Sequence, residues 1–176
     1  MHLTLKSGFL YAGSEQEKTQ LASIKSHGIL GPCKLILSPD GRTMLHTDIE
    51  TVPAAQSGDA FFHRYLLCRG QDTVATGIPQ YAQGEDPAVY GWPMCRAPKV
   101  DKVRLTSIWG EYELFLHSCK DYEVRAQTDS LLAIISHKGL FDGWQLEVYH
   151  DVDFYFLCGL FVFCGYMDQE NDFIVV

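Results

Sequence analysis

The apolar residues fall into short segments in which apolar and polar positions alternate, and a period of two is typical of β-strands. Residues 34–37 and 43–49 flank Ser38-Pro39-Asp40-Gly41, whose residue types favour a turn, so this region predicts a β-hairpin. The same pattern recurs further along the chain. Three more hairpins are predicted, from residues 61–68 with 73–78, 103–109 with 112–118, and 122–127 with 131–137.

Shorter segments add to this pattern. Residues 3–5 and 173–176 predict short strands, and residues 144–150 predict a longer one. Residues 14–24 are largely polar, and two of their apolar residues lie three positions apart, which leaves a short helix or a loop open. The whole pattern predicts a mainly β chain of about 9–12 antiparallel strands joined in hairpins.

The run from residue 154 to residue 164 has a different character, because it is apolar on every side. Asp151 and Asp153 precede it, as capping acids precede helices. A strand is the alternative, since Phe, Tyr and Val favour strands, but eleven residues are long for a strand and Gly159 would weaken it. We expect a helix that is enclosed by protein and too short to cross a membrane.

Composition narrows the class of protein. The chain has 176 residues, 47% of them hydrophobic and 20% charged, which predicts one folded domain over residues 1–176. The net charge of −8 argues against nucleic acid as a partner and against simple electrostatic docking on anionic lipid. Residues 1–6 lack the basic and apolar regions of a signal peptide, so we expect a cytoplasmic location.

A strand at residues 144–148, followed by acids and then by apolar residues 156–163, resembles the tubby C-terminal-like superfamily. That superfamily includes the phospholipid scramblases and the LURP-one-related plant proteins. Asp168 and Asp172 lie where the family has acidic residues after its helix. The resemblance implies a closed antiparallel β-barrel around one apolar C-terminal helix, which is the fold that we expect.

The chain departs from this superfamily in its charged residues. Tubby proteins bind phosphoinositides through basic residues, whereas the basic cluster here is limited to Lys99, Lys102 and Arg104. The cysteine-rich, calcium-binding and membrane-inserting segments of scramblases are not visible. Phosphoinositide recognition and lipid scrambling are therefore not assigned to any residue of this chain.

Motifs for cofactor or metal chemistry are not found in the sequence. It contains no phosphate-binding glycine loop, HExxH motif, EF-hand loop or nucleophile elbow. The seven histidines are scattered. We therefore predict neither a cofactor nor a metal site.

Candidate catalytic residues come from the end of the strand at residues 144–150. Its alternation places His150 on the same side as Trp144, so we expect a partly desolvated imidazole beside Asp151 and Asp153. Such a group could exchange a proton with a substrate. The alternative is that the strand leaves the core at His150 and that the two acids only cap the helix.

Candidate substrate-binding residues are aromatic or apolar. Residues 79–99 form a proline-rich segment with Tyr90, Trp92 and Met94, which could cover a ligand or simply plug the core. Trp109 and Tyr112 lie at a hairpin tip, where they form either a binding rim or the closure of the core. We expect the site at the barrel end where residues 144–150 meet the helix, beneath the segment that contains Trp92.

These residues support two functions. The first is binding of a hydrophobic small molecule or lipid at one end of the barrel. The alternative is a cofactor-independent cyclase or isomerase, for example a pericyclase-like enzyme of secondary metabolism, which needs only a shaped apolar cavity and a few polar groups. A purely structural role is a third possibility.

The cysteines give the first testable prediction. Six cysteines occur without a CxxC pair, and we expect all of them to be reduced. Thiol titration of the denatured, unreduced chain should therefore count six. A count of zero would indicate three disulfides and would contradict both the redox state and the cytoplasmic location. The positions are Cys33, Cys68, Cys95, Cys119, Cys158 and Cys164.

Overall fold

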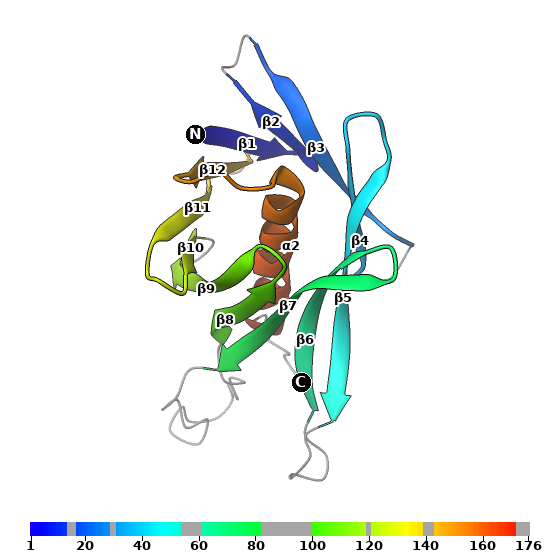
Figure 1. Cartoon of the computed structure of the whole chain (residues 1–176), viewed down its shortest axis with the longest axis vertical. Helices are drawn as coiled ribbons and strands as arrows, with labels where there is room; N and C mark the ends of the chain where they lie inside the picture. Colours follow the sequence, from blue (N-terminus) through cyan, green and yellow to red (C-terminus); the bar gives the residue numbers. More distant parts are fainter. Residues whose placement is uncertain are drawn as a thin grey trace, which may run out of the picture.

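The fold is a closed antiparallel β-barrel with a helix inside it (Figure 1). The computed structural model describes residues 1–13, 17–28, 31–53, 61–81, 100–118, 121–138 and 143–171. In these parts of the chain, twelve strands and the helix α2 (Phe154–Asn171) are present. The strands are β1 (His2–Lys6), β2 (Phe9–Ala12), β3 (Thr19–Ser26), β4 (Lys34–Leu37), β5 (Thr43–Pro53), β6 (Phe61–Arg69), β7 (Asp72–Tyr81), β8 (Val100–Ser107), β9 (Gly110–Ser118), β10 (Asp121–Ala126), β11 (Leu131–His137) and β12 (Trp144–Val148).

The strand order is that of the sequence, and the first strand closes the barrel on the last. β1 and β12 pair antiparallel, with Leu3 opposite Leu146. The N-terminal ammonium of Met1 donates to the Val148 carbonyl at 2.6 Å, and the Val148 amide donates to the Met1 carbonyl at 2.8 Å. Closure gives every strand two neighbours and leaves no unpaired edge. The predicted closed antiparallel barrel is confirmed.

The helix α2 runs through the barrel, as Figure 1 shows. Residues 156–160 are all buried, which on a helix requires protein on every side. The Asp153 carboxylate accepts from the amides of Tyr155 at 2.7 Å and Phe156 at 3.1 Å, so it caps the helix. The predicted buried helix is confirmed, but it continues past residue 164 to Asn171 because Tyr166 and Met167 are also buried.

Several predicted boundaries are wrong. Residues 19–24 belong to strand β3, where the sequence pattern left a helix or a loop open, and β2 was not predicted. Strand β12 ends at Val148 and not at residue 150, and residues 79–81 continue β7. The β8–β9 turn is formed by residues 108 and 109. The predicted strand at residues 173–176 lies outside the described residues.

The four cysteines within the described residues are free. Cys68, Cys158 and Cys164 are buried and Cys33 is half-buried. Burial raises the pKa of the Cys158 thiol to about 12, which makes this thiol unreactive at neutral pH. Among the described helices, none has the length and apolar content needed to cross a membrane.

Two glycines allow the helix and the barrel wall to pack closely. A Cβ on Gly159 of α2 would lie 2.8 Å from a terminal methyl of Leu67 in β6, and one on Gly77 of β7 would lie 2.9 Å from Val103. By contrast, a Cβ on Gly165 would meet nothing within 4 Å, and this residue is exposed. Of the two helical glycines, Gly159 therefore has no room for a larger side chain, whereas Gly165 has.

Alanine substitutions at the two helical glycines should have opposite effects on stability. Gly159→Ala should lower the free energy of unfolding by about 1–2 kcal/mol, because the added methyl overpacks the core against Leu67. Gly165→Ala should raise it by up to about 1 kcal/mol through helix propensity alone. Urea denaturation measures both. Equal stabilisation by the two substitutions would contradict the packing of α2 against β6.

Candidate functional site

Strand length varies around the barrel and decides where the helix is accessible. On one side, β5 has 11 residues and β7 has 10. On the other, β12 and β1 have 5 each and β2 has 4. The short strands cannot cover an 18-residue helix along its whole length. Phe161, in the middle of α2, is only half-buried as a result.

A cleft of about 370 Å³ opens where this short wall ends. It lies between the β1–β2 turn, the start of β12 and the β3–β4 end of the sheet, with the helix behind them. Apolar side chains, two hydroxyls and one ammonium surround it. The lining residues are Leu5, Ser7, Gly8, Ile24, Ser26, Lys34, Gly143, Trp144 and Phe161.

The apolar part of the cleft is built on an aromatic pair. The rings of Trp144 and Phe161 meet edge to face, with centroids 5.1 Å apart. His137 is the cross-strand partner of Trp144, and the two rings meet edge to face with centroids 5.0 Å apart. These contacts fix the orientation of Trp144, because its ring is held between strand β11 and the helix.

Backbone conformation gives the cleft its rim. Ser7 and Gly8 both have positive φ, at 52° and 80°, which produces the tight β1–β2 turn. Gly143 has φ of 76°, and a Cβ there would lie 2.6 Å from the Leu5 carbonyl oxygen. A larger residue at Gly143 would push β1 and the start of β12 apart and change the rim of the cleft.

Lys34 supplies the charge of the cleft. Its ammonium donates to the Ser26 hydroxyl at 2.9 Å, and these two residues are directly opposite in the β3–β4 ladder. The backbone amide of Lys34 donates to the Thr47 hydroxyl at 3.2 Å, which ties this end of β4 to β5. No carboxylate or histidine is among the described residues that line the cleft.

Deeper in the barrel, Thr47 also anchors the helix. Its hydroxyl lies 2.7 Å from the Tyr166 hydroxyl, which donates to the Pro32 carbonyl at 2.8 Å. Tyr166 is 1% exposed. Burial raises the pKa of its hydroxyl to about 12, since a buried phenolate would lose its hydration.

Two further tyrosines anchor the last turns of α2 to the wall. Tyr65 donates to the Glu170 carboxylate at 2.6 Å, and the His63 ring nitrogen lies 3.3 Å from the same oxygen. Tyr122 donates to the Cys164 carbonyl at 3.2 Å and also to the Asp168 carboxylate. The carboxylates after the apolar run therefore hold the end of the helix in place.

The predicted catalytic group is not assembled as expected. His150 is exposed, and the expectation of a partly desolvated imidazole is wrong, because the chain has left the sheet after Val148 to reach the helix. Asp151 is exposed as well, and Asp153 serves as the helix cap. A hollow of about 330 Å³ at this end is lined by residues 151–155 alone. Other elements bring no polar group to it among the described residues.

The predicted substrate-binding aromatics are brought together only in part. The Trp109 ring stacks on Phe156 at 4.7 Å, and Tyr112 lies 5.4 Å from the same ring. The Tyr112 hydroxyl donates to the Trp109 carbonyl at 2.8 Å. Both rings thus cover the first turns of α2, which closes the core at this end. Their role as a binding rim stays a prediction.

Tyr90, Trp92 and Met94 lie outside the described residues. The strand that follows their segment begins at Val100, whose amide and carbonyl both bond to the Asn171 side chain, at 2.7 and 2.8 Å. Val100 is therefore at the C-terminal end of α2, opposite the end that holds His150 and Trp109. The described residues therefore do not bring Val100, which follows the segment that contains Trp92, close to the barrel end at His150.

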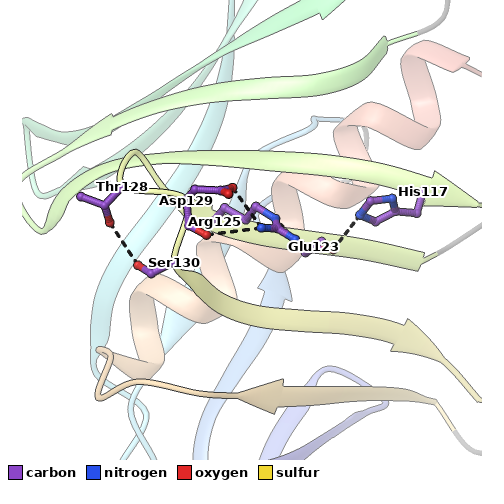
Figure 2. Close-up of polar contacts among 6 residues, drawn as sticks. All are labelled: His117, Glu123, Arg125, Thr128, Asp129 and Ser130. Atoms are coloured by element: carbon purple, nitrogen blue, oxygen red, sulfur yellow. Dashed lines mark hydrogen bonds and ion pairs between the residues drawn. The ribbon is translucent and has the colours of Figure 1, made fainter.

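Figure 2 shows a second group of polar contacts, on the outer face of β9 and β10. His117 lies 2.8 Å from the Glu123 carboxylate, which also pairs with Arg125, and Arg125 in turn pairs with Asp129 at 2.9 Å. Each charged group has its partner within the wall or the adjoining turn. The described residues form no cluster of three or more metal-ligating side chains. These contacts stabilise the wall and do not form a site.

Sequence reasoning missed the cleft at Lys34 and Phe161. Its lining comes from five separate segments, and the positive φ values that shape its rim have no clear signature in the sequence. Comparison of the chain with models of protein families, with curated proteins and with solved structures returned no match. The function must therefore be argued from the cleft itself.

The buried Tyr166 hydroxyl makes stability depend on alkaline pH. The unfolded phenol ionises near pH 10, whereas the folded one stays neutral up to about 12. The contribution of the neutral Tyr166 hydroxyl to the free energy of unfolding is fully present below pH 10 and is lost as pH rises through 12. Over this range the free energy of unfolding falls by up to about 1.4 kcal/mol per pH unit. Tyr166→Phe should cost about 1–3 kcal/mol at neutral pH and flatten this decline.

Urea denaturation from pH 8 to pH 12 measures the effect of Tyr166→Phe, with Tyr11→Phe in half-buried β2 as the matched control. The control should keep the slope of the parent. Cys158 and Cys164 also have raised pKa values through burial, so a smaller decline should remain in Tyr166→Phe. If the decline in stability were as steep in Tyr166→Phe as in the parent, the Tyr166 hydroxyl of the parent would not be buried.

Proposed function

We propose that this protein binds a hydrophobic small molecule or lipid in the cleft between the β1–β2 turn, β12 and α2. The observation that carries the proposal is an accessible apolar surface, made by the half-buried Trp144, Phe161 and Ile24, in a barrel that encloses its own helix. Removing such a surface from water favours binding of an apolar ligand.

The dimensions of the cleft support the proposal. A volume of about 370 Å³ falls in the lower part of the range for small-molecule sites, which is roughly 300–1,000 Å³. Apolar walls with a few convergent polar groups are typical of ligand sites.

The cyclase or isomerase alternative has less support. A cyclase or isomerase that works by proton transfer needs a positioned acid or base close to the substrate. The described lining of the cleft contains no histidine or carboxylate, and His137 contacts Trp144 without lining the cleft. Lys34 is held to Ser26 and is better suited to orienting a ligand than to removing a proton.

We also propose that the chain is a member of the tubby C-terminal-like superfamily. A closed barrel of twelve antiparallel strands around a C-terminal helix supports this, since the resemblance of the sequence implied that architecture. The binding function does not depend on this membership.

Filling the cleft should abolish binding without affecting the fold. Ser26→Trp places a large ring at the mouth of the cleft, at the end of β3. Thr19→Trp introduces the same residue at the opposite, exposed end of β3 and is the matched control. The probe is N-phenylnaphthylamine, a neutral apolar dye whose fluorescence rises when it leaves water.

Ser26→Trp should bind the dye at least about tenfold more weakly than the parent, and Thr19→Trp should stay within about twofold. Thermal melting confirms that both variants fold. Parent protein that does not bind the dye, or equal binding by both folded variants, would overturn the proposed site.

A further inference from the structure

We propose that the cleft is selective for an amphiphile with a single negative charge, an alkyl carboxylate, whose head is held by Lys34 and the Ser26 hydroxyl. This inference rests on the proposed function and adds the chemical class of the ligand. The apolar chain of the ligand lies against Trp144 and Phe161, and its carboxylate reaches the rim of the cleft.

The position of the Lys34 ammonium supports a role in binding an acid. Lys34 and Ser26 face each other across the β3–β4 ladder, and the bond of 2.9 Å between their side chains holds the ammonium at the cleft. An ammonium has three N–H donors, so one bond to Ser26 leaves donors for a ligand. Within the described residues, Lys34 forms no ion pair with a carboxylate, although the chain has 22 acidic residues.

The charge of the surroundings favours one negative charge over several. Lys34 is the cation that lines the cleft, and no described carboxylate lines it. Lys6 and Lys138 also lie beside Gly143, but both are exposed and their charges are screened by salt. A net charge of −8 repels a polyanion more strongly than a monoanion.

The polar and apolar parts of the cleft are arranged for an amphiphile. Lys34, Ser26 and Ser7 come from the ends of strands and from a turn, at the rim, whereas Phe161 comes from the enclosed helix. A ligand with its apolar chain directed toward Phe161 therefore has its head at Lys34. A carboxylate there gains a charge-assisted hydrogen bond that an alcohol of equal length cannot make.

The test compares decanoate with decanol, which share one apolar chain and differ in the charge of the head. Isothermal titration calorimetry at neutral pH measures both dissociation constants for the full chain. The parent should bind decanoate at least about tenfold more tightly than decanol. Lys34→Met should reduce this ratio to within about twofold and leave the affinity for decanol unchanged within about twofold.

Lys25→Met is the matched control, because Lys25 is exposed on β3 next to Ser26 and does not line the cleft. It removes the same charge and should keep the preference for decanoate. Equal binding of the two ligands by the parent, or a preference that survives in Lys34→Met, would overturn the assignment of the head.

A third ligand, decyl phosphate, separates two kinds of anionic head. Binding of decyl phosphate more than tenfold tighter than decanoate would replace the carboxylate by a phosphate and contradict the proposal of a single charge. If neither decanoate nor decanol binds, the proposed function fails together with this inference. If both bind equally, only the assignment of the head fails.

Discussion

The enclosure of α2 within the barrel is the constraint on which the rest of this structure depends. A barrel of twelve strands has an interior too wide for its own side chains to fill, and the helix supplies the missing volume. This requirement explains why residues 156–160 are all apolar or small, and why a Cβ on Gly159 of the helix would crowd Leu67 of the wall. The hydrophobic cores of wall and helix are one core, so neither is expected to be stable alone.

Polar contacts at its two ends fix the position of the helix along the barrel. At its start, the Asp153 carboxylate accepts the first helical amides. At its end, Tyr166 bonds to the β3–β4 connection and β5, and Asn171 bonds to the first residue of β8. Hydrophobic burial has no directional preference, so these bonds determine how far the helix enters. They thereby determine that Phe161 is level with the end of the short wall.

The cleft follows from the mismatch between a long helix and unequal strands. Beside the short strands β1, β2 and β12, Phe161 and Trp144 are accessible, whereas β5 and β7 are about twice as long. The opposite end of the barrel is closed by Trp109 and Tyr112 over Phe156. The aromatic residues thus have two different roles, closing the core at one end and lining the cleft at the other.

The sequence by itself determined the class of fold, the main hairpins and the buried helix. Its period-two alternation marks strands whose two faces differ, and an apolar run with an acidic cap marks a helix enclosed by protein. It did not determine β2 and β3, because residues such as Gln20, Ser23 and Lys25 become strand only through pairing with their neighbours. The expected partial burial of His150 is wrong for a related reason: alternation continues in the sequence after the strand has ended. Only the tertiary structure decided where the cleft lies, since strand lengths, the depth of the helix and the Lys34–Ser26 contact depend on residues far apart in the chain.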